Sequence, residues 1–417
     1  MKAVQEGIFL SVCLSHKYKT NMLMIKFMTP YNEHRAAYQN LLASLLEAGS
    51  LLIQSRSELE QRLAYLYGAN LGISVRRQGN YLEFTLLSSI IRNDLLPQAV
   101  NLTDEWLELI QDLICNQAFD DRVAERFQRE KALLLQKRHR QKDDKQRQAG
   151  VRLFERLYEG KGSDAFGSQG SLATLEQATL VDVANEYRYL LEEAQLHIIL
   201  HGVGNEAELT QWLSSWQLPP RHVEIDYHQN YLERLALPFE VWEEETVGEQ
   251  TNLMLAYSFP PALTMERILI AATANALFGV LPTSELFMSI REQKSLTYQI
   301  MSAIDFQRHL VLVSAGVAND KGELVTAEIQ ASLQHLMQTL DERQLEQAKM
   351  SLFNYEVQNR DLQETELIQV FSKQMLPKFD LSLANYQAIL ERITVQDIVA
   401  CLQTWQPIGC YLLKGGA

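Results

Sequence analysis

Cysteine and long apolar runs are both scarce in this chain of 417 residues. The four cysteines, Cys13, Cys115, Cys401 and Cys410, lie far apart and form no C-x-x-C pair, which argues against a disulfide framework and a zinc knuckle. We therefore expect reduced thiols and a cytoplasmic protein. The apolar run GIFLSVCLS near the start is too short to span a bilayer and has no small-residue cleavage pattern, so we expect neither a membrane segment nor an export signal.

Basic residues are also in short supply. The 38 lysines and arginines are outnumbered by 52 acidic residues, and a net charge of -14 argues against nucleic acid as a partner. The exception is the stretch 121–148, which gathers ten basic residues on a helix-forming pattern. We interpret it as a solvated helix face with ion pairs; the alternative is a surface that attracts acidic peptides or docks an acidic partner.

Apolar residues make up 47% of the chain, which is ample for packed cores in two or three domains. Residues 6–29 alternate between apolar and polar and predict a strand hairpin, and the pattern AAYQNLLASLLEAG after Pro30 predicts a helix that ends at Gly49. SELEQRLAYLYG predicts a second helix. The run 69–89 predicts two strands joined at residues 78–80, followed by long helices to about residue 158 and the buried strand QLHIILHGV.

The second half repeats this order of strands and helices. LEQATLVDV at 175–183 matches LERITVQDI at 390–398, an offset of 215 residues in a chain of 417. An echo at half the chain length, with the same order of elements, indicates an internal duplication. We predict an N-terminal half at 1–225, a proline-rich and acidic linker at 226–245, and a C-terminal half at 246–417.

A stretch of the second half, SELFMSIREQKSLTY, resembles the pitrilysin and mitochondrial-processing-peptidase family, the inverzincin zinc peptidases, and the resemblance covers nearly the whole chain. The family has the pattern S-R-L-F-x-x-L-R-E-x-x-G-L-A-Y here. The residues in step with it are Ser284, Leu286, Phe287, Ile290, Arg291, Glu292, Leu296 and Tyr298. The chain departs from the pattern at Ser295, where the family has glycine, at Glu285, where it has arginine, and around Gly279, where FGVLPT replaces a glycine-rich turn.

The resemblance implies an α+β fold of two similar halves, each a mixed, mainly antiparallel sheet covered by helices, that form a clam-like chamber. It also implies that Arg291 and Tyr298 bind an extended peptide near its scissile bond. A guanidinium offers forked charged donors and a phenol offers one donor, which suits a backbone carbonyl or the oxyanion formed from it. The alternative is that Arg291 caps a helix end and Tyr298 packs in a strand.

The zinc motif of the family, H-x-x-E-H, is missing. The stretch NLLASLLEAGS places Asn40 and Ser44 where the histidines belong and Ala43 where the general base belongs. The position of the third ligand falls on Lys137, and an ammonium is not a ligand. The resemblance therefore implies a chain with no catalytic residue and no bound metal, and no peptidase activity of its own.

Two other groups of histidines have spacings that could suit a metal site. His197 and His201 are four apart on a predicted strand, which separates them too widely for one zinc. HVEIDYH would place four ligand-type side chains on one face of an extended run, which could bind a divalent ion, but a solvated linker strand explains the pattern more simply. The four ligand-type side chains of this run are His222, Glu224, Asp226 and His228.

The chain keeps the arginine and tyrosine motif but lacks H-x-x-E-H, which suggests that a second chain supplies the zinc site. The leading hypothesis is a non-catalytic, substrate-binding subunit of a heterodimeric zinc peptidase, in which a paralogue bearing H-x-x-E-H brings the zinc and both chains share a chamber. In the absence of that paralogue, two copies of this chain could pair. Nucleic acid and membrane are not expected as partners.

A closer resemblance is to the catalytically degenerate bacterial branch associated with the aminopentanol modification of elongation factor EF-P. It rests on KYKTN, LYGANLGISVRRQGN and GSQGSLATLEQAT. The rival function is a stand-alone peptide-binding scaffold that captures an extended segment by strand addition and cuts nothing. An independent hydrolase has little support, because no G-x-S-x-G motif or Cys and His constellation is present.

Overall fold

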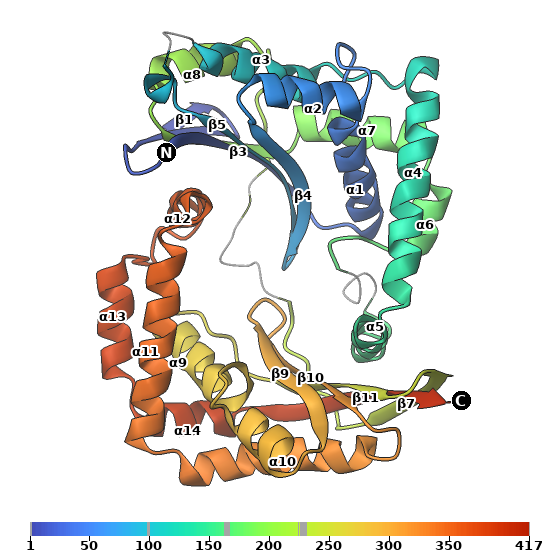
Figure 1. The fold of residues 1–417 in the computed structure, drawn as a ribbon, viewed down its shortest axis with the longest axis vertical. Helices are drawn as coiled ribbons and strands as arrows, with labels where there is room; N and C mark the ends of the chain where they lie inside the picture. Colours follow the sequence, from blue (N-terminus) through green and yellow to red (C-terminus); the bar gives the residue numbers. More distant parts are fainter. Residues whose placement is uncertain (1, 98–100, 162–166, 224, 226–231, 417) are drawn as a thin grey trace. The chain divides into compact units, whose positions relative to one another are not determined.

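The computed structural model describes residues 2–97, 101–161, 167–223, 225 and 232–416 (Figure 1). Contacts divide the chain into two compact units. Unit 1 comprises Met1–Arg138, Gly167–Asn230 and Arg360–Pro377, and unit 2 comprises His139–Phe166, Tyr231–Asn359 and Lys378–Ala417. Each unit therefore contains one segment that comes from the other half of the sequence.

Unit 1 contains a six-stranded mixed sheet in the order β1-β2-β6-β3-β5-β4. Its strands are β1 (Lys2–Gln5), β2 (Ile8–Leu14), β3 (Thr20–Pro30), β4 (Asn70–Gln78), β5 (Tyr81–Ile91) and β6 (Gln195–Gly202). The predicted hairpin at residues 6–29 is wrong: two strands form, but β6 lies between them, parallel to β2 and antiparallel to β3. All eight residues of β6 are buried, and such a strand belongs in the middle of a sheet.

Unit 2 contains a five-stranded sheet in the order β7-β11-β8-β10-β9. Its strands are β7 (Val241–Val247), β8 (Thr251–Ser258), β9 (Thr297–Asp305), β10 (Leu310–Val317) and β11 (Gln406–Gly416). This order matches β2-β6-β3-β5-β4, and β7 is parallel to β11 as β2 is to β6. The expected fold of two mixed, mainly antiparallel sheets covered by helices is confirmed. Strand β7 begins inside the stretch that the sequence assigns to the linker.

Helices cover both faces of the first sheet. They are α1 (Glu33–Glu47), α2 (Arg56–Tyr65), α3 (Leu102–Cys115), α4 (Asp121–Lys142), α6 (Leu172–Gln177), α7 (Leu180–Glu192), α8 (Glu206–Ser214) and α12 (Gln363–Met375), with a 3₁₀ turn at Asn93–Leu95. Alternate residues of β3 serve the two faces, as a strand requires. Leu23 and Ile25 lie on one face and join the main core with α1, α3 and α7. Met24 and Met28 lie on the other face and pack with Leu367 and Phe371 of α12.

Unit 2 has the same construction. Its helices are α5 (Lys145–Leu157), α9 (Met265–Asn275), α10 (Gly322–Thr339), α11 (Glu342–Asn359), α13 (Leu383–Arg392) and α14 (Val395–Gln403), with π-helical segments at Ala276–Val280 and Phe287–Gln293. Leu253 and Leu255 of β8 face the main core, while Ala256 packs with Leu153 and Leu157 of α5 on the other face. Thus α12, from the second half of the chain, covers the first sheet, and α5, from the first half, covers the second. Within the described ranges, no helix is both long enough and apolar enough to cross a membrane.

The sequence echo has a structural counterpart at the start of two helices. Thr179 caps α7 and Thr394 caps α14, and in each case an aspartate three residues later, Asp182 or Asp397, accepts a hydrogen bond from the backbone of the capping residue. The reciprocal bonds satisfy backbone donors that the first helical turn leaves unpaired. The repeated letters therefore encode the same helix start in both halves.

Candidate functional site

The positions expected for the zinc ligands lie on α1 and are occupied by groups that do not fit the metal. The amide nitrogen of Asn40 donates to the carbonyls of Ala36 (2.8 Å) and Ser168 (2.7 Å), and the Ser44 hydroxyl donates to the carbonyl of Asn40 (3.3 Å). Ala43 is buried in the core. Zinc in proteins takes imidazole, thiolate or carboxylate ligands, and this surface presents an amide donor, a hydroxyl and a methyl group.

The third position and the remaining histidines offer no substitute. Lys137 is exposed on α4, and the buried Glu130, about two turns earlier, is held by Arg56 at 3.5 Å and Arg129 at 3.4 Å. Across the part of the chain that the structure describes, no group of three or more His, Cys, Asp or Glu side chains is arranged to hold a metal ion. His197 is fully buried, between Gln195 and Gln374, and burial lowers its pKa to about 3.

The HVEIDYH group falls largely outside the described residues, namely at Glu224, Asp226 and His228. Its first member, His222, lies 2.8 Å from a carboxylate oxygen of Glu6. His201 is buried at the end of β6, where Gln363 of α12 donates to its carbonyl at 3.0 Å. Both histidines therefore have described partners within unit 1.

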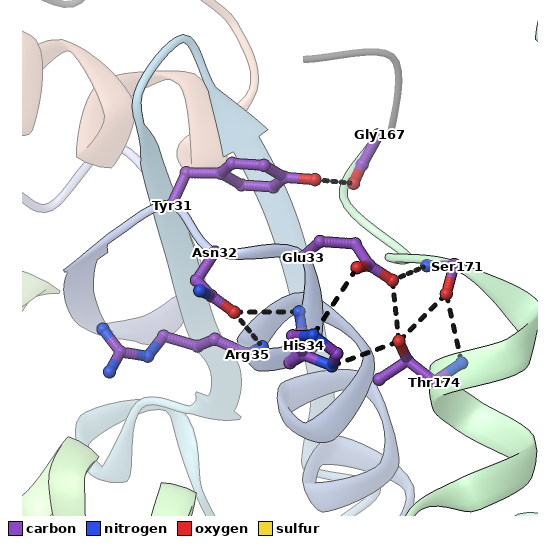
Figure 2. A network of polar contacts seen from close by, with 8 residues as sticks. All are labelled: Tyr31, Asn32, Glu33, His34, Arg35, Gly167, Ser171 and Thr174. Carbon is purple, nitrogen blue, oxygen red and sulfur yellow. Dashed lines mark hydrogen bonds and ion pairs between the residues drawn. The ribbon is translucent and has the colours of Figure 1, made fainter. Parts of the chain in front are cut away.

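The start of α1 instead anchors a segment of the chain's own backbone (Figure 2). The carboxylate of Glu33 accepts hydrogen bonds from the backbone of Ser171 (2.9 Å) and the hydroxyl of Thr174 (2.7 Å), and the Tyr31 hydroxyl donates to the carbonyl of Gly167 (3.3 Å). Burial disfavours the charge on Glu33, but the bonds from Ser171 and Thr174 outweigh it and hold the pKa of this carboxyl below its ordinary value.

Part of the basic stretch secures the same segment. Arg138 donates to the carbonyls of Gln169 (2.8 Å) and Gly170 (3.1 Å), and Lys131 donates to those of Glu176 and Ala178 (both 2.8 Å). These cations supply hydrogen-bond donors to backbone carbonyls of residues 169–178. Some of the charge in 121–148 thus has an internal structural use, which the sequence interpretation of a solvated face does not include.

Arg291 and Tyr298 lie in a stretch of irregular backbone in unit 2. Arg291 belongs to the π-helical segment Phe287–Gln293, which ends when the backbone amides of Lys294 and Leu296 donate to the carbonyls of Ser289 (3.2 Å) and Ile290 (3.0 Å). Between them Ser295 has φ +50°, the left-handed conformation for which the family keeps glycine. π-Helical turns and positive φ at a residue other than glycine are uncommon and concentrate at functional sites.

Both side chains line one cavity of about 1050 Å³, formed entirely within unit 2. Its wall is built from the start of α5, the turn between β7 and β8, the end of the π-helical segment, the start of β9, the end of β10 and the residue before α10. The charged and aromatic side chains in it are Asp144, Lys145, Glu249, Arg291, Glu292, Tyr298 and Lys321. A wall with both signs of charge and several backbone segments suits a polar chain such as a peptide better than an apolar ligand.

The two predicted residues differ in how they are held. The Arg291 guanidinium lies 3.5 Å from a carboxylate oxygen of Glu292 and 4.5 Å from the centre of the Phe287 ring, and 43% of the side chain is exposed. Its place in the last turn also lets its charge favour the helix end, as the alternative interpretation has it. Tyr298 is 92% exposed, so the alternative in which it packs in a strand does not describe it.

The cysteines do not supply another nucleophile. All four are free, and burial raises the pKa of each thiol: to about 12 for Cys115 and Cys410, to about 11 for Cys401, and above the ordinary value for Cys13. A reactive cysteine needs the opposite shift, because the thiolate is the nucleophile.

Comparisons with known proteins show what the sequence and the fold are similar to. Residues 178–352 match the family model described as the peptidase M16 inactive domain. Over the whole chain, and 97% of the relative, the sequence is 22% identical to a protein of Bacillus subtilis described as the probable inactive metalloprotease YmfF. The chain is therefore similar to M16 peptidase-family proteins, through the family model in its second half and through one relative over its full length. That relative is described as probably inactive, and in this chain the positions of the H-x-x-E-H motif hold Asn40, Ala43 and Ser44.

Solved structures show the same fold over the full length. A conserved protein from Enterococcus faecalis superimposes with a TM-score of 0.91 at 28% identity, covering 100% of this chain and 98% of that one. An M16 inactive domain from Pseudomonas fluorescens has a TM-score of 0.77 at 16% identity, covering 100% and 97%. The second likeness concerns the M16 fold alone.

Sequence reasoning missed several residues of the site. Lys145 and Lys321 enter the cavity from helices far from the Arg and Tyr motif in sequence, and no local pattern marks them. Outside this cavity, in unit 1, Glu47 was also missed, although a lone carboxylate in the apolar stretch NLLASLLEAGS is a signal: its oxygen accepts the backbone N–H of Ile73 on the edge strand β4 at 2.9 Å. Thr297, between the matched residues Leu296 and Tyr298, also lines the cavity and was not predicted.

Proposed function

We propose that this chain is the non-catalytic, substrate-binding subunit of a zinc-dependent peptidase. It presents Arg291 and Tyr298 to an extended peptide that a separate M16 protein, bearing H-x-x-E-H, cleaves. The observation that carries the proposal is the contrast within one chain. Both residues line one polar cavity. By contrast, Asn40 and Ser44 stand at the zinc-ligand positions, and Ala43 at the position of the general base, in arrangements that do not fit the metal.

The exposed side chains have chemistry that suits a peptide. Arg291 keeps a half-exposed guanidinium whose contacts, a carboxylate at 3.5 Å and a ring face, are weaker than a bidentate pair and can be exchanged for a substrate carbonyl. Tyr298 exposes its phenol and makes no hydrogen bond to another residue of the described chain. Strand β9 is an edge strand, so an extended peptide can pair with its backbone beside these donors.

The first test is the metal content and peptide hydrolysis of the purified chain, alone and mixed with its H-x-x-E-H paralogue. We expect no bound zinc and no hydrolysis alone, and cleavage on mixing. Stoichiometric zinc with activity in the isolated chain would overturn the proposal. If neither the isolated chain nor the mixture hydrolyses peptides, and the chain forms a stable complex with a peptide, the result would instead favour the stand-alone scaffold.

A second test addresses the two residues. In the mixed protein, Arg291→Ala and Tyr298→Phe are each expected to lower kcat/KM by about 10-fold or more, the effect of losing one well-placed donor, without weakening the pairing of the subunits. Arg343→Ala and Tyr355→Phe on α11 are matched controls, because both residues are exposed in the same unit and lie outside the cavity. Unchanged turnover in both test variants would remove Arg291 and Tyr298 from the mechanism.

The identity of the peptide is a separate matter. The resemblance suggests a link to EF-P modification and a cytoplasmic setting, and both stay predictions. Proteins of that modification pathway are the first substrates to offer to the mixed subunits, with an unrelated unfolded protein as the comparison. Equal cleavage of both would argue against the link while leaving the subunit role intact.

A further inference from the structure

The exposure of Tyr298 has a cause in the pairing of β9 with β10. Gly316 lies opposite Gln299, but the next residue, Val317, lies opposite Thr297, so Tyr298 is an extra residue with no partner across the ladder. This is a β-bulge, a feature that re-aims a side chain beside many active sites.

The burial pattern shows what the bulge changes. Further along β9, Ile300 and Ser302 are buried while Met301 and Ala303 are exposed, the alternation of a strand with one buried face. Continued backward, the alternation would bury Tyr298 and expose Thr297. The structure has the reverse: Tyr298 is 92% exposed and Thr297 only 6%.

One hydroxyl lies at the centre of the bulge. The Thr297 Oγ1 atom is 2.6 Å from the carbonyl oxygen of Gly316 and 2.8 Å from that of Gln299, to which its proton can be donated, and it accepts the backbone N–H of Gln299 at 3.2 Å. It thus serves backbone groups of both strands where the regular ladder is interrupted. The family pattern has alanine here, so this contact is additional to the matched motif.

We propose that Thr297 is a positioning residue: its hydroxyl locks the bulge and thereby holds the Tyr298 phenol in the cavity, where it meets a carbonyl of the bound peptide. Without the hydroxyl, the bulge has no side-chain anchor. The strand can then relax toward regular pairing, which would turn Tyr298 toward the buried face. The inference about peptide contact rests on the function proposed above, whereas the lock on the backbone does not.

The test compares Thr297→Val, which keeps the shape and loses the hydroxyl, with Thr297→Ser, which keeps the hydroxyl. Amide hydrogen exchange at Gln299 and chemical nitration of Tyr298, located by peptide mapping, report the lock without any peptidase. We expect the valine variant to exchange the Gln299 amide about 10-fold faster and to change the nitration rate of Tyr298, and the serine variant to resemble the wild type. Unchanged exchange and nitration in Thr297→Val would overturn the proposal.

Cleavage by the mixed subunits then tests the connection to Tyr298. Thr297→Val should lower kcat/KM about 10-fold, Thr297→Ser should restore it, and Thr297→Val should add no loss when Tyr298 is already phenylalanine. A full additional loss in that background would show that Thr297 acts on something other than Tyr298 and would overturn the positioning role. If exchange and nitration change as expected but neither Tyr298→Phe nor Thr297→Val affects turnover, the lock stands and the proposed function of Tyr298 fails.

Discussion

At the scale of single residues, Ser295 holds a backbone conformation that costs an L-amino acid free energy. Its φ of +50° lies in the left-handed region, which glycine adopts without a Cβ penalty. We predict that Ser295→Gly raises the free energy of unfolding by about 0.5–1 kcal/mol, as measured by urea unfolding. Ser289→Gly, in the π-helical segment itself, is the matched control and should lower it. A lower free energy of unfolding in Ser295→Gly would contradict the inference that the backbone at Ser295 is strained.

A second prediction concerns the buried His197. Burial lowers the pKa of His197 to about 3 from an ordinary 6.5. Below pH 6.5 the imidazole is therefore protonated in the unfolded chain but stays neutral in the folded chain. As the pH is lowered below 6.5, the free energy of unfolding therefore decreases, and His197 contributes about 1.4 kcal/mol of this decrease per pH unit. His197→Phe, which keeps a ring beside Phe9 and Phe371, should have a shallower slope between pH 6 and 4 in urea unfolding. Above pH 7 the two slopes should agree, and equal slopes below pH 6 would refute the assignment.

The sequence pattern marked two residues that line the cavity in unit 2, but it did not predict the local backbone structure around them. The matched pattern named Arg291 and Tyr298, and the departure at Ser295 fell where the structure has a positive φ. It could not show that Thr297 is buried, because the alternation of a strand assigns that residue to the exposed face and only the unpaired residue in the ladder reverses it. A bulge is a property of two paired strands, and a single strand's letters do not contain it.

At the scale of elements, the two edge strands β4 and β9 occupy equivalent places in the two sheets but are treated differently. The outward backbone N–H of Ile73 on β4 is already bound to the carboxylate of Glu47, at 2.9 Å. A peptide that adds to β4 must displace this carboxylate first. The arrangement favours β9 as the edge that remains open to an extended chain.

This contact gives a third prediction. Glu47→Ala leaves a half-buried backbone donor without its acceptor and should lower the free energy of unfolding by about 1–2 kcal/mol, with faster hydrogen exchange at the Ile73 amide. Glu47→Gln keeps an acceptor oxygen and should recover most of the loss. Glu60→Ala on the exposed face of α2 should change stability by less than about 0.5 kcal/mol. Exchange at Ile73 that is the same in Glu47→Ala and wild type would show that the contact contributes nothing.

The element pattern also explains the one pairing that sequence reasoning got wrong. Strands β2 and β3 follow one another closely, and nearby strands usually pair. Strand β6 displaces that pairing because eight buried residues need a neighbour on each side, a requirement that comes from a segment far along the chain. By contrast, the turn between β4 and β5 was predictable, since Gly79 and Asn80 close a hairpin from Gln78 to Tyr81 locally.

At the scale of the whole molecule, the duplication is visible as two sheets with the same order of their five equivalent strands. Each sheet is nevertheless covered on one face by a helix from the other half of the sequence. One face of the first sheet is covered by α12, and one face of the second is covered by α5. A repeat detected from sequence suggests halves that are complete in themselves. The exchange is invisible to that argument, because both helices have the amphipathic patterns of ordinary surface helices.

The exchange gives a fourth prediction. Fragments 1–225 and 226–417, expressed separately, should each be expanded and prone to aggregation, because each lacks the helix that covers its sheet. Mixed during refolding, they should recover the near-ultraviolet circular dichroism of the intact chain. A peptide of residues 360–377 should stabilise fragment 1–225, whereas the same peptide with Leu367 and Phe371 changed to alanine should not. Cooperative unfolding of fragment 1–225 alone, at the stability of the intact protein, would contradict this dependence.

The borrowed helix α12 also has a consequence for the order in which the chain is made. During synthesis, strands β3 and β6 emerge from the ribosome long before residues 363–375, so the apolar face formed by Met24, Met28 and Ile199 waits for a cover that is not yet translated. At about 5–20 residues per second, that wait lasts on the order of 10–30 s. The nascent first half must therefore spend this interval either shielded by a chaperone or short of its final packing. Slow codons between the two halves would lengthen the exposure rather than help the first half to finish folding.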